Sequence, residues 1–228
     1  MTTQQGLFIM LEGTDGSGKT TQTDLLVKRL QQEHIPVEQI SFPQYGEKSA
    51  AMVEAYLNGT FGTAEDVGPY RASIFYAVDR YAASEKIKAW LAAGKVVIAN
   101  RYVASNMAHQ GGKIKDPEAR KTYLDWNYQL EYRIFQIPKP DINIILHVTP
   151  DISQSLVDKK EARAYLNGKK RDIHEDDINH LKDAEQAYID IANNYPEFTL
   201  IECVDADKLL PVEVIQEKIW QQIKKQLH

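Results

Sequence analysis

The residues with the clearest chemistry form a glycine-rich run, Gly13-Thr14-Asp15-Gly16-Ser17-Gly18-Lys19-Thr20. This run matches the G-x-x-x-x-G-K-[ST] loop, in which backbone N–H groups point at phosphate oxygens. In such a loop Lys19 bridges the β- and γ-phosphates of a nucleoside triphosphate, and the Thr20 hydroxyl ligates magnesium. The run therefore predicts a binding site for ATP and Mg²⁺, made of Gly13, Asp15, Gly16, Ser17, Gly18, Lys19, Thr20 and Thr21.

The elements on either side of this run must position it. Residues 6–11 form a short apolar run that predicts a buried strand, and residues 19–32 carry leucines at helical spacing. The N-terminus of a helix that follows such a loop adds partial positive charge, which favours bound phosphate. This context favours a true phosphate loop over a chance glycine-rich turn. A GTPase is not favoured, because its guanine-reading segment begins with an Asn-Lys pair and this chain has no such pair.

Strand and helix patterns alternate through the rest of the chain. We predict further strands at residues 37–42, 96–99, 142–148 and 198–204. We predict further helices at residues 49–58, 69–93, 117–135, 151–160, 184–194 and 212–226. The alternation predicts an α/β fold, with a five-stranded parallel sheet and helices on both faces. Such sheets bind ligands beyond the carboxyl ends of their strands.

Residues 163–177 form a polar, basic segment with Gly168 near its middle. We interpret it as part of a mobile lid, inserted at about residues 159–177 of a single domain that spans residues 1–228. A lid that closes over the phosphates would exclude water and limit wasteful hydrolysis of ATP.

Composition limits the kinds of binding partner and the compartment that we expect. The 228 residues carry a formal net charge of -5, which is a poor match for nucleic acid, because nucleic-acid binding calls for a basic face. No apolar run approaches the ~18 residues of a membrane span, and the N-terminus lacks the features of a signal peptide. Cys203 is the only cysteine, so no internal disulfide is possible and a reducing cytoplasm is expected. We therefore expect small-molecule substrates, no nucleic acid and no membrane.

Four segments resemble one family. Glu12 to Gln22 looks like the E-G-x-D-G-x-G-K-[ST]-T-Q opening of thymidylate kinases, and Asn100 to Gln110 is similar to their D-R-[YF]-x-x-S-x-x-A-[YF]-Q segment. Phe42-Pro43 and the Tyr76 to Arg80 stretch, like the family's F-x-x-x-R, agree in order and spacing. The resemblance covers nearly the whole chain. It implies a P-loop kinase fold, and transfer of the ATP γ-phosphoryl group to dTMP to give dTDP.

The resemblance also implies roles for individual residues. Tyr76 would stack on thymine and Arg80, one helical turn later, would contact its O4. Arg101 would hold phosphate oxygens, and Asp15 would contact the 3′-hydroxyl of the acceptor. The remaining positions would line the acceptor pocket or approach its base or sugar: Phe42, Pro43, Ser105, Asn106 and Gln110. Family members usually form homodimers, so we expect one here.

Three residues depart from the family pattern. Asn100 replaces the Asp before the strand-three Arg; it can hold a water bound to magnesium but brings no charge. Tyr45 stands where many members carry an Arg for the acceptor phosphate, and Lys48 or Arg71 could substitute. His109 replaces an aromatic residue, and we do not interpret it as a catalytic base.

Some thymidylate kinases place an additional transition-state cation, an Arg, inside the phosphate loop and others place basic residues in the lid; the variable loop positions here, Thr14 to Ser17, are not basic. We expect this cation from the lid, with Arg163 and Arg171 as the best candidates.

Two alternative functions stay open. A deoxynucleoside kinase would gain from a carboxylate base, for which Glu12 is the obvious acid. A non-catalytic nucleotide-binding module would bind ATP without acceptor-dependent release of ADP.

Overall fold

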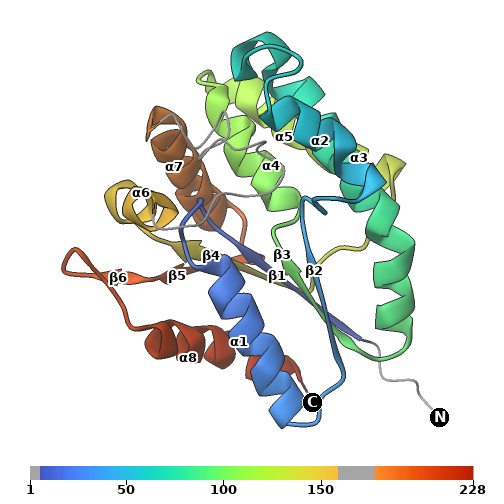
Figure 1. The fold of residues 1–228 in the computed structure, drawn as a ribbon, viewed down its shortest axis with the longest axis vertical. Coiled ribbons are helices and arrows are strands. Elements are labelled where there is room, and N and C mark those ends of the chain that lie inside the picture. The colour runs from blue at the N-terminus through green and yellow to red at the C-terminus, as the bar shows by residue number, and fades with distance from the viewer. Residues whose placement is uncertain (1–5, 159–177, 228) are drawn as a thin grey trace.

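The computed structural model describes residues 6–158 and 178–227. Its centre is a five-stranded parallel sheet in the order β2-β3-β1-β4-β5 (Figure 1). The strands are β1 (Leu7–Glu12), β2 (Val37–Ser41), β3 (Val96–Asn100), β4 (Ile142–His147) and β5 (Phe198–Glu202). The predicted five-stranded parallel sheet is confirmed. The predicted lid, with Arg163 and Arg171, lies outside the described residues.

Helices cover both faces of the sheet, as predicted (Figure 1). The α-helices are α1 (Lys19–Gln32), α2 (Ala51–Leu57), α3 (Ala64–Ala92), α4 (Val103–His109), α5 (Pro117–Tyr128), α6 (Pro150–Asp158), α7 (Ile178–Asn194) and α8 (Val212–Ile223). The shorter helical turns are η1 (Lys48–Ala50), η2 (Gly111–Lys113), the π-helical η3 (Gln129–Ile134) and η5 (Lys224–Gln226). None of the helices in the described ranges is both long and apolar enough to cross a membrane.

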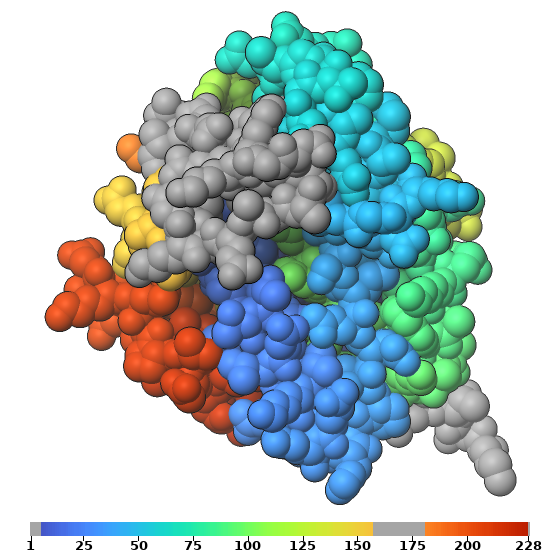
Figure 2. Space-filling view, in the orientation of Figure 1, coloured from blue at the N-terminus to red at the C-terminus, as the bar shows by residue number. Residues whose placement is uncertain are grey.

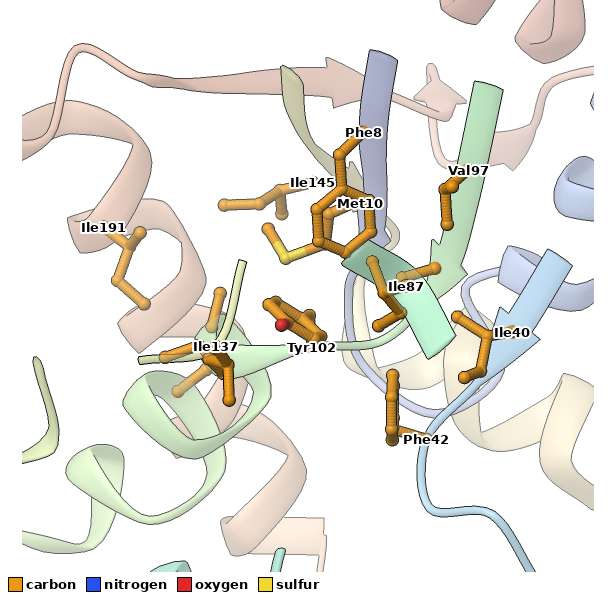
Figure 3. Packing of buried hydrophobic residues seen from close by; sticks show 14 of the residues in the cluster. Phe8, Met10, Ile40, Phe42, Ile87, Val97, Tyr102, Ile137, Ile145 and Ile191 are labelled. Atoms are coloured by element: carbon orange, nitrogen blue, oxygen red, sulfur yellow. The ribbon is translucent and has the colours of Figure 1, made fainter. Parts of the chain in front are cut away.

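Strand β1 divides the hydrophobic core into two clusters, because successive side chains of a strand face opposite sides of the sheet. Phe8 and Met10 join the cluster under α3, α4 and α7, where Phe8 packs edge-on to Tyr102 with ring centroids 5.1 Å apart (Figure 3). Ile9 and Leu11 join the cluster under α1 and α8. Both faces of residues 7–11 are therefore apolar, which explains the continuous apolar run in the sequence.

Helices α1 and α8 come from opposite ends of the chain but lie side by side (Figures 1 and 2). Gln22 Nε2 donates a hydrogen bond to the Val212 carbonyl at 3.0 Å. Further along, Arg29 lies over the Trp220 ring, 4.0 Å from its centroid, and pairs with Glu217 at 2.8 Å. These contacts bring the start of α8 to the phosphate-loop end of α1.

Several predicted helices differ from those observed; the helix predicted at residues 184–194, for example, begins at Ile178 as α7. Helix α3 begins at Ala64 instead of residue 69, because Thr63 and Asp66 form a capping box that adds a short helix before Gly68. Gly68 leaves the helical conformation with φ 73°, and the helix from Pro69 follows the predicted course. The predicted helix 117–135 changes to a π-helix after Tyr128.

Two elements were not predicted from the sequence. Residues after β3 form the short helix α4, and the chain after β5 forms a hairpin of β6 (Val204–Asp205) and β7 (Lys208–Leu209). The fifth strand therefore ends at Glu202, two residues earlier than predicted. Both elements border the carboxyl edge of the sheet, where parallel α/β folds bind their ligands.

Candidate active site

A single cavity of about 740 Å³ brings the predicted site residues together at the carboxyl ends of β1, β2 and β3. It is lined by predicted phosphate-loop residues from Asp15 to Thr21 and by predicted acceptor residues from Phe42 to Gln110. Gly13 does not line it but lies next to it, and its carbonyl accepts a hydrogen bond from Lys19 at 3.0 Å. Arg163 and Arg171 lie outside the described residues.

The phosphate loop connects β1 to α1 through glycines that no other residue could replace without strain. Gly16 has a φ of +82°, and a Cβ there would lie 2.4 Å from the Ser153 carbonyl oxygen. Ser153 also donates its hydroxyl to the Asp15 carbonyl, so α6 supports the loop from outside. Gly18 is the N-cap of α1 in the left-handed conformation. The loop is thus held tightly against the N-terminus of a helix, where anions bind.

The ammonium of Lys19 lies inside this loop and is only 7% exposed. It donates to the carbonyls of Gly13 and Thr14, at 3.0 and 2.7 Å, and to Ser17 Oγ at 3.2 Å. A buried cation with carbonyl partners, beside the positive end of a helix, makes this end of the cavity suitable for phosphate groups.

Arg101 provides a second cation at the cavity, directly after β3. Its Nη2 pairs with Asp15 Oδ1 at 2.7 Å, and its Nη1 lies 3.1 Å from His109 Nε2. Burial disfavours the charged form, but the Asp15 carboxylate, together with Tyr188, Glu12 and Tyr45, more than offsets it, so the pKa of Arg101 lies above its usual value. Because a guanidinium only donates, Nε2 of His109 must accept, and the histidine proton lies on Nδ1. His109 therefore orients Arg101, and the geometry gives it no role as a base.

The backbone at Arg101 is strained. Its φ of +68° lies in the left-handed region, which costs a non-glycine residue about 1–2 kcal/mol. Residues in such conformations gather at functional sites, where the surrounding structure enforces them.

Glu12 enforces the turn after β3. Its fully enclosed carboxylate accepts from the backbone N–H groups of Tyr102 and Ser105, at 2.6 and 3.0 Å. It also accepts from Ser105 Oγ and from Tyr188 OH, both at 2.8 Å. Four donors occupy the oxygens of Glu12, so the carboxylate is committed to holding the Arg101 turn and is not available as a base. Ser105 likewise connects Glu12 to Arg101, whose Nη1 lies 3.3 Å from its hydroxyl.

The other end of the cavity contains Arg80, which is 1% exposed. Its Nε donates to Glu131 Oε1 at 3.0 Å, its Nη2 pairs with the same carboxylate, and its Nη1 donates to the Tyr102 carbonyl at 3.2 Å. Burial lowers the pKa of Arg80, but Glu131 outweighs this, and the pKa is raised. The Arg80–Glu131 pair leaves N–H donors at this end of the cavity but little net charge. This environment suits a neutral nucleoside base better than a phosphate.

Three further side chains complete this end. Tyr76 lines the cavity and stands edge-on to Tyr56, with ring centroids 6.3 Å apart. Asn106 Nδ2 donates to the carbonyl of Ser73 at 3.2 Å and to Asn127 at 3.3 Å. Because the amide nitrogen is used in this way, Asn106 offers Oδ1, an acceptor, to a ligand in the cavity.

The loop after β2 forms the wall between the two ends. The Phe42-Pro43 peptide is cis, and Phe42 both lines the cavity and packs against Tyr102 in the core. Asp79, fully buried on α3, accepts from the Gln44 backbone N–H at 2.8 Å and from Ser49 Oγ at 2.6 Å. This anchoring turns Tyr45 toward the cavity, which it lines.

The two cations suggested as substitutes for an acceptor-phosphate Arg lie elsewhere. Lys48 is exposed on η1, and Arg71 donates to the Asp66 carbonyl at 2.9 Å. Neither lines the cavity, so this hypothesis finds no support.

A magnesium ion at this site would meet neutral ligands. Asn100 Nδ2 donates to Thr20 Oγ1 at 3.2 Å, and Asn100 Oδ1 is enclosed without a hydrogen-bond partner in the described structure. An orphaned acceptor beside the Thr20 hydroxyl fits a hydrated Mg²⁺, which keeps several waters and takes further ligands from substrate phosphates. The described residues contain no cluster of three His, Cys, Asp or Glu side chains that could hold a metal by themselves.

Apolar residues that the sequence did not indicate line the cavity near Thr21 and Gln22. They are Leu156, Leu209, Val212 and Ile215. No local pattern marks them, since α6 supplies Leu156, the β6–β7 hairpin supplies Leu209, and the contact between α1 and α8 brings in Val212 and Ile215. An apolar surface next to a phosphate loop is suitable for the flat ring of a nucleoside base.

Comparisons with known proteins agree with this geometry. A family model described as thymidylate kinase matches residues 11–219. The chain is 30% identical over 223 residues to the thymidylate kinase of Halothermothrix orenii, covering 96% of this chain and 97% of the relative. It is 29% identical over 188 residues to that of Mycobacterium tuberculosis, covering 82% and 86%. The structure of thymidylate kinase from Candida albicans is similar with a TM-score of 0.76, at 20% identity, over 97% of this chain and 92% of that one. The last likeness supports the fold.

Proposed function

The chain belongs to the thymidylate kinase family, and from this premise we propose that its cavity transfers the γ-phosphoryl group of ATP to dTMP, giving dTDP. One observation carries the proposal: the phosphate loop lies at one end of a single cavity, and the Arg80–Glu131 pair lies at the other. We call the end around this pair the base site; it offers hydrogen-bond donors but carries little net charge. Such a cavity suits two nucleotides whose phosphates meet between Lys19 and Arg101.

The base site supports a pyrimidine with an imide edge. Thymine offers a carbonyl acceptor at O4 and an N–H donor at N3. Arg80 supplies donors for O4, and Asn106 Oδ1 supplies an acceptor for N3–H. Cytosine would present an amine and a bare nitrogen to the same pair, so both contacts would be mismatched. Tyr76 would stack on the ring.

The phosphate end supports charge stabilisation as the main catalytic device. An oxygen of the dTMP phosphate attacks the γ-phosphorus, the bond from that phosphorus to the bridging oxygen breaks, and ADP leaves. Lys19 and Arg101 stabilise the charge that spreads over the transferring group. The Tyr45 hydroxyl is the donor that we propose for the acceptor phosphate in place of the family's Arg. Asp15, held by Arg101, would accept from the 3′-hydroxyl of dTMP.

The same arrangement disfavours a deoxynucleoside kinase. That reaction gains from a carboxylate base near the attacking hydroxyl, and the carboxylate of Glu12 is fully engaged by four donors.

Magnesium would be bound mainly through the triphosphate, with Thr20 as a direct ligand and Asn100 holding a bound water. The ion supplies charge neutralisation for the β- and γ-phosphates. Arg163 and Arg171 stay proposals as the further cations of a lid at about residues 159–177.

The described elements pack around one sheet, which supports one kinase domain. Limited proteolysis that releases two fragments, each of which folds on its own, would contradict a single domain.

The decisive measurement is ADP release from Mg-ATP with dTMP, dUMP, dGMP, thymidine or no acceptor. We expect release to depend strongly on dTMP, with weak responses to dGMP and thymidine, and to fall to background when EDTA removes magnesium. Release with thymidine but not with dTMP would indicate a nucleoside kinase. ATP binding without acceptor-dependent release would indicate a non-catalytic module.

A homodimer is the assembly that we propose. Ile74, Val78 and Tyr81 follow one another at helical spacing on α3, and their exposed fractions of 40%, 42% and 52% are high for apolar residues. An apolar stripe of this kind is typical of an interaction surface, and a second copy of α3 would cover it.

Val78→Glu is expected to convert the dimer to a monomer, because each copy would bury an unpaired carboxylate in the interface. Sedimentation velocity measures this directly. Met52→Glu, on α2 and 46% exposed, is the matched control and should leave the mass unchanged. A wild-type protein that sediments as a monomer at micromolar concentration would contradict the proposal.

The cytoplasm is the compartment that we propose, since the reaction uses ATP and the one cysteine is a buried thiol. Cell fractionation that recovers the chain outside the cytosolic fraction would contradict it.

A further inference from the structure

The side chain of Gln110 is only 1% exposed, and it lines the acceptor end of the cavity. Its Oε1 accepts a hydrogen bond from Lys113 Nζ at 2.8 Å. An ammonium group only donates, so the amide must turn its oxygen toward Lys113 and its nitrogen away from it. Gln110 Nε2 makes no hydrogen bond with any described residue. Lys113 therefore decides that Gln110 offers N–H groups, and not an oxygen, to a ligand.

Lys113 is itself in an unusual environment for a lysine. It is half-buried, and its second partner is another neutral group, the Tyr56 hydroxyl at 3.3 Å. Desolvation lowers the pKa of Lys113 to about 8. The neighbouring carboxylate of Asp183 pairs with Lys115 instead, at 2.5 Å. A cation drawn out of water toward an amide and a phenol, with no carboxylate partner in the described part of the chain, is costly to keep for packing alone.

The Lys113 contacts lead directly to the base site. Tyr56 is fully buried and stands edge-on to Tyr76, the residue that would stack on the acceptor base. Lys113 thus connects Gln110, which lines the cavity at the end of α4, to Tyr56 on α2, which supports Tyr76 from outside the cavity.

We propose that Lys113 is a positioning residue for acceptor recognition: it fixes the Gln110 amide so that Nε2 donates to a carbonyl oxygen of the acceptor base. The inference rests on the proposed function, because it assumes a pyrimidine with carbonyl groups at this end of the cavity. Without the ammonium, the amide can rotate and present Oε1, which repels a carbonyl oxygen. Lys113 acts through Gln110 and does not touch the substrate.

The test is a double-mutant cycle on steady-state kinetics. Lys113→Met should raise the KM for dTMP roughly 3- to 10-fold, the effect of one net hydrogen bond, with kcat and the KM for ATP unchanged. Lys113→Arg keeps a donor and should restore most of the affinity. In a Gln110→Leu background, Lys113→Met should have no further effect, because the amide it orients is gone.

Lys115→Met is the matched control, since it removes a neighbouring lysine from an exposed ion pair. Gln110→Glu is a second variant that keeps the contact with Lys113 but removes the donor, and it should also raise the KM for dTMP. A rise in KM for Lys113→Met that persists undiminished in the Gln110→Leu background would overturn the proposal, as would an equal rise in the KM for ATP. Wild-type protein that does not respond to dTMP would overturn the proposed function itself, whereas normal wild-type kinetics with an unaffected Lys113→Met would overturn this inference alone.

Discussion

Replacing Lys19 by methionine is expected to lower dTMP-dependent ADP release about 10³-fold. The ammonium is fixed inside the phosphate loop by Gly13, Thr14 and Ser17, so it needs no reorganisation to meet developing charge on the transferring phosphoryl group. Removing one such preorganised donor costs on the order of 10²–10³ in kcat, and Lys19 also carries a full charge. Methionine keeps most of the side-chain volume, so the loop should stay folded.

Single-turnover kinetics with saturating Mg-ATP and dTMP measure this effect on the chemical step. The matched control is Lys28→Met, which removes an exposed lysine from the same helix and should leave the rate within about twofold. A Lys19→Met protein that retains a tenth or more of the wild-type rate would show that the phosphate loop is not where transfer occurs. Thermal unfolding of both variants separates a chemical defect from a folding defect.

The parts of the site that could be predicted are those with local causes. Helix α1 matches its predicted range of 19–32, because the signals that predict it lie within a few residues of one another: the loop glycines, Lys19 and the leucine spacing. The order of strands and helices was likewise predictable from apolar periodicity. The sequence motifs also indicated most of the residues that line the cavity at the carboxyl edge of the sheet; Gly13 lies beside it, and Arg163 and Arg171 lie outside the described residues.

The parts that could not be predicted depend on contacts between distant residues. Glu131 lies 51 positions from Arg80, within an aromatic stretch that reads as an ordinary helix, and nothing local marks it as a buried partner. The apolar surface beside Thr21 depends on a hairpin that the sequence did not indicate. Lys48 and Arg71 seemed near enough to replace the missing Arg, but Asp79 fixes the loop so that Tyr45 faces the cavity instead.

Glu131 provides the second large effect: Glu131→Ala is expected to destabilise the protein by about 3–5 kcal/mol. The change leaves the guanidinium of Arg80, which is 1% exposed, without its counter-charge in the protein interior. Chemical denaturation measures the free energy of unfolding. Glu85→Ala is the control, because it breaks the exposed Lys88–Glu85 pair and should cost no more than about 1 kcal/mol.

The double variant Arg80→Met/Glu131→Leu separates stability from recognition. Apolar side chains of similar size can replace a buried ion pair at little or no cost, so the free energy of unfolding should recover most of the loss. Affinity for dTMP should not recover, because the donors that face O4 of thymine are gone; a loss of roughly 10-fold or more in calorimetric binding is expected. If the double variant is stable and still binds dTMP like the wild type, then Arg80 and Glu131 serve the core alone, and the base site must lie elsewhere in the cavity. If stability returns while dTMP affinity stays low, this buried pair is retained for recognition of the base, at no advantage to the fold.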